Sequence, residues 1–203
     1  MELRIDHSAI AFTEHGKIHD LTHLTDESFV AITSYEIDFL DKEHTPFPAL
    51  LEKPLEHAHM EAVHMNLYAY DPHNVTPIDL TDLKVPFSLE NVNEAVRRAR
   101  EAGFFVIYNH PNWSLNTGET YCRLRGLCGL ELMNGASQRS SDMDYTPLVY
   151  DQMLRSGQRL ICVGGDDNHN KQPFGHPLCD SFGAHTMIVA DELEYDNVFS
   201  AFE

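Results

Sequence analysis

The sequence predicts an α/β fold in which strands and helices alternate along the chain. Seven short runs rich in β-branched and aromatic residues have the length of strands, and two amphipathic segments have the length of helices. A helix that follows one strand and precedes the next is typical of layered folds with parallel strands. The chain has 203 residues, which is the length of one domain. We therefore expect a single α/β domain over residues 1–203.

The expected strands are spread over the whole chain. In chain order they are 10–13, 29–35, 62–70, 104–108, 127–133, 160–163 and 186–190. Residues 37–60, between the second and third runs, hold Pro46, Pro48 and Pro54 among many charges, which predicts an insertion loop. The Ser-rich segment 136–142 is also expected to be a loop.

Two segments carry helix signals at both ends. Residues 88–103 begin with the N-cap Ser88, place an acid early and bases late, and end in a glycine. Residues 146–157 begin with a threonine followed by Pro147, and they also end in a glycine. Both segments are therefore expected to be helices of the α/β layers.

The charge balance narrows the classes of partner. Fourteen Lys and Arg against 32 Asp and Glu give a net charge of −18, which repels phosphate backbones and anionic lipid head groups. The sequence shows no secretory signal and no run of about 18 apolar residues that could span a membrane. The four cysteines form no C-x-x-C pair, which predicts reduced thiols. We expect a cytoplasmic protein whose partner is neither a membrane nor a nucleic acid.

Side chains that can bind metal close four of the strand runs. His15, Glu36, His110 and the pair Asp167 and His169 follow the first, second, fourth and sixth runs, His64 lies within the third, and Glu131 and Asn134 punctuate the fifth. In α/β barrels the chemistry lies where strands end and loops begin. Imidazole and carboxylate ligands together suit Zn, Mn or Fe. Gly164 and Gly165 allow a tight turn that aims the side chains after them. The recurrence favours a shared metal site over unrelated capping residues.

Two other histidine groupings compete with that interpretation. His15, His19 and His23 are spaced by four residues and would share one face of a helix, although the glycine at position 16 disfavours a helix there. His57 and His59 form the only H-x-H of the chain, but they lie in the Pro-rich segment and are interpreted as a surface pair. Arg139 is a candidate contact for an anionic substrate. The sequence contains neither a G-x-S-x-G nucleophile motif nor a Gly-rich phosphate-binding motif.

Six short motifs follow one another along the chain. They are Thr13-Glu-His15, Ser34-Tyr-Glu36, Val63-His-Met-Asn66, Asn109-His-Pro-Asn-Trp113, Leu130-Glu-Leu-Met-Asn-Gly135 and Gly165-Asp-Asp-Asn-His169. In order and approximate spacing they resemble the later motifs of the polymerase and histidinol phosphatase (PHP) domain. The similarity covers most of the chain and is greatest to stand-alone bacterial metal-dependent phosphoesterases. The H-P-x-W and G-x-D-x-H motifs are its most specific parts.

The resemblance implies a distorted (β/α)7 TIM-like barrel that holds one to three divalent ions, Zn, Mn or Fe. Such a domain hydrolyses a small phosphorylated substrate through a metal-activated water. Carried over residue by residue, Glu36 would bridge two metals, His64 and His110 would complete the second, Asp167 would serve the first, and His15 with His169 would serve the third. Glu36, Asp167 and His169 would then be the catalytic residues.

The chain departs from the family pattern at its N-terminal end. The family opens with an H-x-H on its first strand, and nothing before Thr13 matches it, so we expect a barrel that is incomplete at the N-terminus. The last helical pattern, 194–203, has no capping residue behind it, so the C-terminal end of the barrel is expected to be incomplete too. Two alternatives stay open: a degenerate metal-binding domain without catalysis, and a metal-dependent amidohydrolase. The sequence leaves the oligomeric state open.

Overall fold

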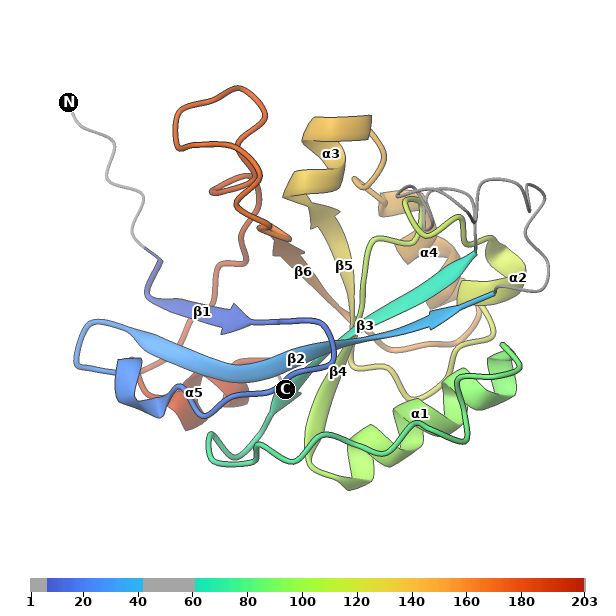
Figure 1. The fold of residues 1–203 in the computed structure, drawn as a ribbon, viewed down its shortest axis with the longest axis horizontal. Helices are drawn as coiled ribbons and strands as arrows, with labels where there is room; N and C mark the ends of the chain where they lie inside the picture. Colours follow the sequence, from blue (N-terminus) through green and yellow to red (C-terminus); the bar gives the residue numbers. More distant parts are fainter. Residues whose placement is uncertain (1–6, 42–60, 203) are drawn as a thin grey trace.

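A curled sheet forms the centre of the protein and has the shape of half a barrel (Figure 1). The computed structural model describes residues 7–41 and 61–202. Within them, six strands lie side by side in chain order: β1 (Ala9–Phe12), β2 (Val30–Leu40), β3 (Ala62–Ala69), β4 (Phe104–Tyr108), β5 (Gly129–Asn134) and β6 (Ile161–Gly165). The mixed α/β class is confirmed, and the described part of the chain forms a partial barrel.

The strand directions are mixed. β1 with β2, β4 with β5, and β5 with β6 run parallel, as expected. β3 runs antiparallel to both of its neighbours, so the expectation of parallel strands is wrong there. The register pairs Leu40 with Ala62 and Ser34 with Tyr68, so β3 returns directly along β2. The hydrophobic period of a strand shows which residues are buried but not which way the strand runs relative to its neighbours, so the sequence pattern does not reveal the direction of β3.

Three sequence expectations about local structure need correction. The expected strand at 186–190 is absent, because Met187 and Val189 are 87% and 94% exposed, and the Thr186 hydroxyl bonds to both backbone groups of Gly164 in place of a ladder. The loop expected from residue 37 begins later, since β2 continues to Leu40. The remaining loop residues 42–60, with Pro46, Pro48, Pro54, His57 and His59, lie outside the described residues.

The third correction concerns the Ser-rich segment, which forms the helix α3 (Gly135–Ser141) instead of a loop. The Asn134 side chain accepts a hydrogen bond from the Ser137 amide at the N-terminal end, and Asp142 closes the helix in a left-handed conformation, φ 57°. These two caps outweigh the weak helix propensity of serine.

The expected helices are confirmed. α1 (Leu89–Glu101) has the side chain of Ser88 as its N-cap, and α4 (Pro147–Arg155) begins with its proline. Shorter helical segments are η1 (Thr22–Leu24), α2 (Gly118–Tyr121) and α5 (Tyr195–Ser200). No helix within residues 7–41 and 61–202 is long and apolar enough to cross a membrane.

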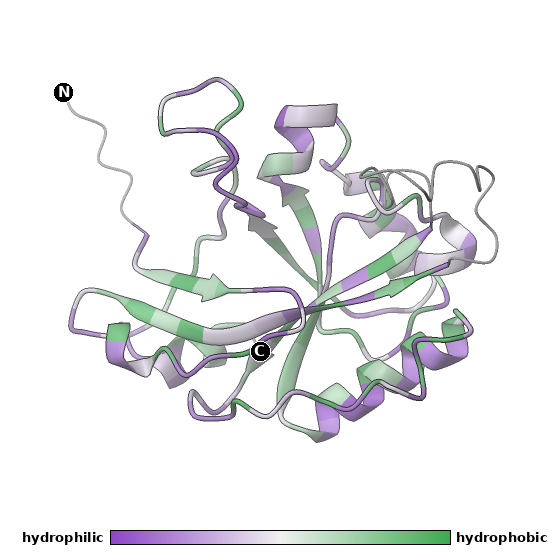
Figure 2. Cartoon of the chain, in the orientation of Figure 1, coloured by the Kyte–Doolittle hydropathy of each residue, from purple (hydrophilic) through white to green (hydrophobic). Residues whose placement is uncertain are grey.

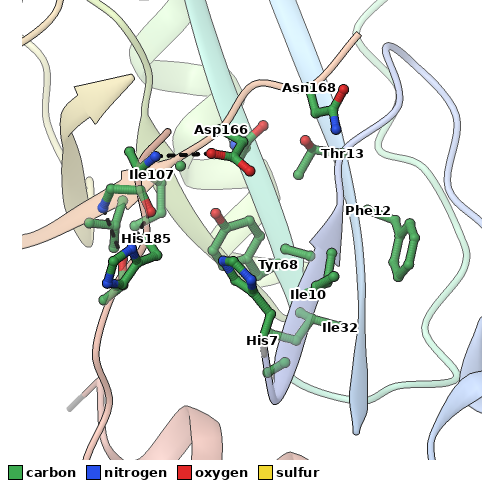
Figure 3. A pocket seen from close by; sticks show the side chains of 18 of the residues that line it. His7, Ile10, Phe12, Thr13, Ile32, Tyr68, Ile107, Asp166, Asn168 and His185 are labelled. Atoms are coloured by element: carbon green, nitrogen blue, oxygen red, sulfur yellow. Dashed lines mark hydrogen bonds between the residues drawn. The ribbon is translucent and has the colours of Figure 1, made fainter. Parts of the chain in front are cut away.

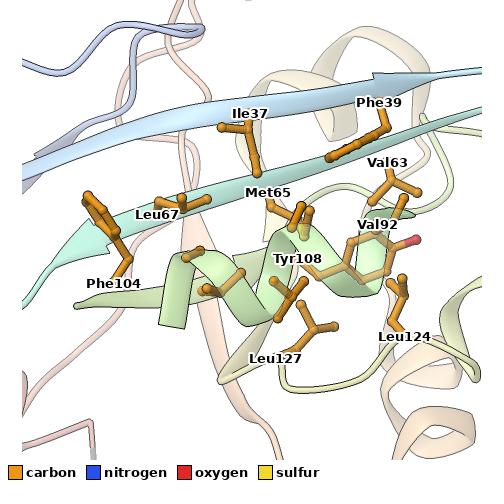
Figure 4. Close-up of a cluster of buried hydrophobic side chains, with 14 of the residues drawn as sticks. Ile37, Phe39, Val63, Met65, Leu67, Val92, Phe104, Tyr108, Leu124 and Leu127 are labelled. Carbon is orange, nitrogen blue, oxygen red and sulfur yellow. The ribbon is translucent and has the colours of Figure 1, made fainter. Parts of the chain in front are cut away.

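The sheet separates two apolar cores. On its convex face, side chains of β2, β3 and β4 pack against the apolar side of α1, whose other side is hydrophilic (Figures 2 and 4). Leu67, Phe104 and Val96 are among the buried residues of this larger core. On the concave face, Ile32, Ile107 and Val163 form a smaller core with α5. The candidate metal ligands Glu36 on β2 and His64 on β3 also lie on the concave face, further along these strands.

Candidate metal centre

The centre is built where β2 meets β3 and the loop that follows β1. Glu36 lies on β2, and His64 lies on β3 opposite Asp38, two positions along the ladder from Glu36. His15 forms a parallel bridge with Glu36, and the amide of Gly16 donates to the Glu36 carbonyl at 2.8 Å. Gly16 has φ +65°, which a glycine adopts without strain, so the chain can turn away directly after His15.

Three side chains meet closely enough to hold one metal ion. His64 Nδ1 lies 2.9 Å from Glu36 Oε1, and His15 Nε2 lies 3.3 Å from Glu36 Oε2. One ligand atom from each residue lies within 4.8 Å of the other two. Glu36 and His64 are buried, whereas His15 is exposed. The carboxylate therefore presents one oxygen to each imidazole at the edge of the concave face.

A buried nitrogen of His64 fits this interpretation. Nε2 of His64 has no hydrogen-bond partner among the described residues, although solvent does not reach it. A buried polar atom without a partner costs free energy, and nearly all such atoms in folded proteins have one. A bound cation would use the lone pair of an imidazole nitrogen in this cluster, so the donor set fits Zn, Mn or Fe.

His110 lies against the same carboxylate. Its Nε2 is 3.5 Å from Glu36 Oε1, and its Nδ1 is 3.0 Å from the hydroxyl of Ser114. Burial lowers the pKa of His110, but the hydrogen bond to Glu36 and the charges of Glu131, Glu36 and Asp167 outweigh it and raise this pKa to about 9. Conversely, burial raises the pKa of Glu36, but the hydrogen bonds and charges of His110 and His64 hold it well below its usual range.

Asn109 and Trp113 support this group, and the sequence analysis assigned neither of them a role. The Asn109 side chain donates to Glu36 Oε1 at 3.1 Å. The Trp113 ring packs edge-on against His110 and His64, with centroids 5.1 and 5.7 Å away. Both lie within the Asn109-His-Pro-Asn-Trp113 motif, so their nearness to His110 in sequence could have identified them.

A second set of carboxyl groups lies on β5 and on the turn that follows β6. Glu131 Oε2 accepts hydrogen bonds from the His110 amide at 3.0 Å and from the Asn134 side chain at 3.1 Å. The same Asn134 nitrogen donates to Asp167 Oδ2 at 3.1 Å, so it joins the two carboxyl groups. Burial and the charge of Asp167 raise the pKa of Glu131 to about 8, although His110 and Asn134 oppose the shift.

Asp167 and His169 lie on the turn after β6. His169 Nδ1 is 2.7 Å from the Asp167 carbonyl oxygen, and its ring lies 6.5 Å from the ring of His15. The paired glycines before this turn act by close approach, since neither has a positive φ and a Cβ on Gly165 would lie 3.0 Å from Glu131 Oε1. Asp167 and His169 border the cavity described next, and they lie outside the three-residue group.

The remaining candidates have other partners. The Arg139 guanidinium donates to the backbone carbonyls of Cys179, Ser181 and Phe182, so it fastens that segment to α3. The helix that would align His15, His19 and His23 is absent, and His19 pairs with Glu14 at 3.1 Å. None of the four cysteines, all within the described residues, forms a disulfide.

A cavity of about 1400 Å³ opens beside the metal-capable group on the concave side of the sheet (Figure 3). Its polar end includes His15, Glu36, His110 and Asp167. Its other end includes Ile32 and other apolar side chains of the smaller core. A ligand bound there would therefore contact both kinds of surface.

No protein-family model, curated protein or solved structure matches this chain. What the protein does is therefore inferred from the residues of the site.

Proposed function

We propose that the protein is a metal-dependent phosphoesterase of the PHP type that hydrolyses a small phosphorylated molecule. The observation that carries the proposal is the group formed by His15, Glu36 and His64, of which His15 and Glu36 line the polar end of a large cavity. The donor set suits Zn, Mn or Fe, with one to three ions per chain. The cysteine pattern, which contains no C-x-x-C pair, favours a reducing compartment such as the cytoplasm.

The chain's own residues hold the ligands in one orientation. Glu36 directs Oε1 towards His64 and Oε2 towards His15, which is the arrangement that a bridging carboxylate needs. The Asn109 amide fixes the rotation of that carboxylate, and the Ser114 hydroxyl orients the His110 ring through Nδ1. Such outer contacts set the direction and basicity of metal ligands.

The opposite side of the polar end supplies groups that can hold a proton. Divalent ions held by His15, Glu36 and His64 would lower the pKa of a water molecule and neutralise charge on phosphoryl oxygens. Glu131, with its pKa raised to about 8, can hold a proton at neutral pH. The Glu131 carboxyl group would give this proton to the departing alcohol oxygen, and Asn134 holds it in place.

The first test combines metal content with turnover. Protein purified without chelators is analysed for Zn, Mn and Fe, and hydrolysis of 4-nitrophenyl phosphate is measured with added Mn²⁺ or Zn²⁺. We expect about one or more ions per chain and metal-dependent turnover, with both lost in Glu36→Gln and in His64→Ala. His73→Ala is the matched control, because His73 is exposed, pairs with Asp20 and is not part of the three-residue group.

The outcomes separate the three functions. Metal that both site variants remove, without turnover of any phosphoester, would overturn the enzyme proposal in favour of a non-catalytic metal-binding domain. Turnover of an amide substrate in place of a phosphoester would favour an amidohydrolase. Turnover that persists unchanged in His110→Ala would also contradict the proposed site.

A further inference from the structure

The two ends of the cavity differ in chemistry. Ile32 lies four residues before Glu36 on β2, so both side chains point to the concave face. The neighbouring strand places Ala11 in register with Ile32, and its small side chain leaves space above the apolar floor. Tyr68, Ile107 and Val163 continue this floor across the sheet, and Figure 3 shows Tyr68 near the middle of the view. Ile107 and Val163 are buried in the smaller core, whereas Tyr68 is half-buried.

The charges of the cavity favour one anionic group only. Seven of its lining residues are Asp or Glu, and none of the lining residues in the described ranges is Lys or Arg. The nearby guanidinium of Arg139 is already occupied by three backbone carbonyls. An anionic group away from the metal-capable end would therefore face carboxylates without a compensating cation.

Resting on the proposed function, we propose that the substrate is a phosphomonoester of an uncharged, apolar alcohol, with an aryl or branched alkyl body. The single phosphoryl group lies at the polar end of the cavity, which His15 and Glu36 line. The body covers the part of the floor that solvent still reaches, which is formed by the half-buried Ala11 and Tyr68. The apolar surface removed from water contributes affinity, and the surrounding carboxylates exclude substrates with a second anionic group.

Three phosphonates that differ in one group each test this proposal by binding, independently of turnover. They are methylphosphonate, benzylphosphonate and 4-carboxybenzylphosphonate, titrated calorimetrically into the Mn²⁺-loaded protein. We expect benzylphosphonate to bind at least about tenfold more tightly than methylphosphonate, because its ring is buried on the floor. The added carboxylate is expected to cancel that gain.

A cavity-filling variant locates the effect. Ala11→Leu extends a side chain over the floor and is expected to weaken benzylphosphonate binding about tenfold while leaving methylphosphonate binding unchanged. Ala102→Leu makes the same change at an exposed position beyond the end of α1, and it should alter neither affinity. The comparison of the three ligands on the unaltered protein stands even if Ala11→Leu does not fold.

Each failure has its own meaning. If methylphosphonate binds but benzylphosphonate binds no more tightly, the apolar substrate class is wrong and the phosphoesterase proposal stands. If 4-carboxybenzylphosphonate binds as tightly as benzylphosphonate, the exclusion of a second anionic group is wrong. If no phosphonate binds to the metal-loaded protein, the proposed function itself fails, and the substrate class fails with it.

Discussion

The two faces of β2 show how one strand serves two purposes. On the convex face, Tyr35, Ile37 and Phe39 are buried among apolar side chains of the neighbouring strands and α1. On the concave face, Ser34 and Glu36 are equally buried, yet Glu36 meets imidazoles and an amide. On the convex face the hydroxyl of Tyr35 accepts a hydrogen bond from the Ile78 amide. On the concave face the buried Nε2 of His64 has no hydrogen-bond partner among the described residues. We infer that the convex face stabilises the sheet and the concave face binds ligands.

The largest expected effect on stability comes from the convex face. Phe104→Ala removes a fully buried ring that packs edge-on against Tyr35, and it should lower the free energy of unfolding by about 3–5 kcal/mol. Urea unfolding measures the loss. Metal affinity of the protein that remains folded should be unchanged, so a parallel loss of metal binding would show that the two faces are not independent.

The next largest effect is on metal affinity and comes from the concave face. Glu36→Gln keeps the size of the side chain but removes the charge that both imidazoles face, so metal affinity should fall at least about 100-fold. Titration with Zn²⁺ against a competing chelator measures the change, with His73→Ala as the control. Unaltered affinity in Glu36→Gln would place the metal elsewhere.

The titratable groups on the concave face should also make the stability of the protein depend on pH once a chelator has removed bound metal. His110 has a native pKa of about 9 against about 6.5 when unfolded. Between these values only the native state holds the proton, so its stabilisation is complete below about pH 6.5 and is lost as the pH rises to about 9. Glu131, raised to about 8, acts in the same direction between about pH 4.5 and 8.

Urea unfolding of the metal-free protein from pH 6.5 to 9 measures this effect, and we expect His110 alone to account for a loss of about 3 kcal/mol. His110→Gln should flatten the profile. Metal binding near pH 7.5 should release protons, because ligands bind deprotonated. A stability that rises over this interval would contradict the assigned charges.

The smallest effect concerns Asn134, which joins the carboxyl groups and caps α3. Asn134→Ala should cost about 1 kcal/mol of stability through the lost cap, whereas Asn134→Ser should restore the cap but not the link between Glu131 and Asp167. Thermal unfolding compares the two variants. Equal stability of the alanine and serine variants would show that the cap contributes nothing.

The sequence predicts the convex side of the fold better than the concave side. Ser88 and Pro147 correctly predict where α1 and α4 begin, and the first six apolar runs correspond to β1 to β6. Local patterns settle such elements because caps and hydrophobic periods act within a few residues. The direction of β3 and the exposed state of 186–190 depend on long-range pairing, and no local pattern contains that information.

The candidate site shows the same limit. The positions of His15 and Glu36 after strand runs, with His64 inside the next run, predicted a shared site, and the structure brings these three together. Their grouping depends on the bridge between His15 and Glu36 and on the register of β2 with β3. The roles of Asn109 and Glu131 follow from burial and hydrogen bonds, which the sequence does not display.

The central claim is that a divalent ion binds between His15, Glu36 and His64. The most direct test is anomalous X-ray scattering from crystals grown with Mn²⁺ or Zn²⁺. The account predicts a peak about 2.0–2.3 Å from a carboxylate oxygen of Glu36 and from a nitrogen of each imidazole. Crystals that contain the ion only at other positions, or that show no peak at saturating metal, would contradict it.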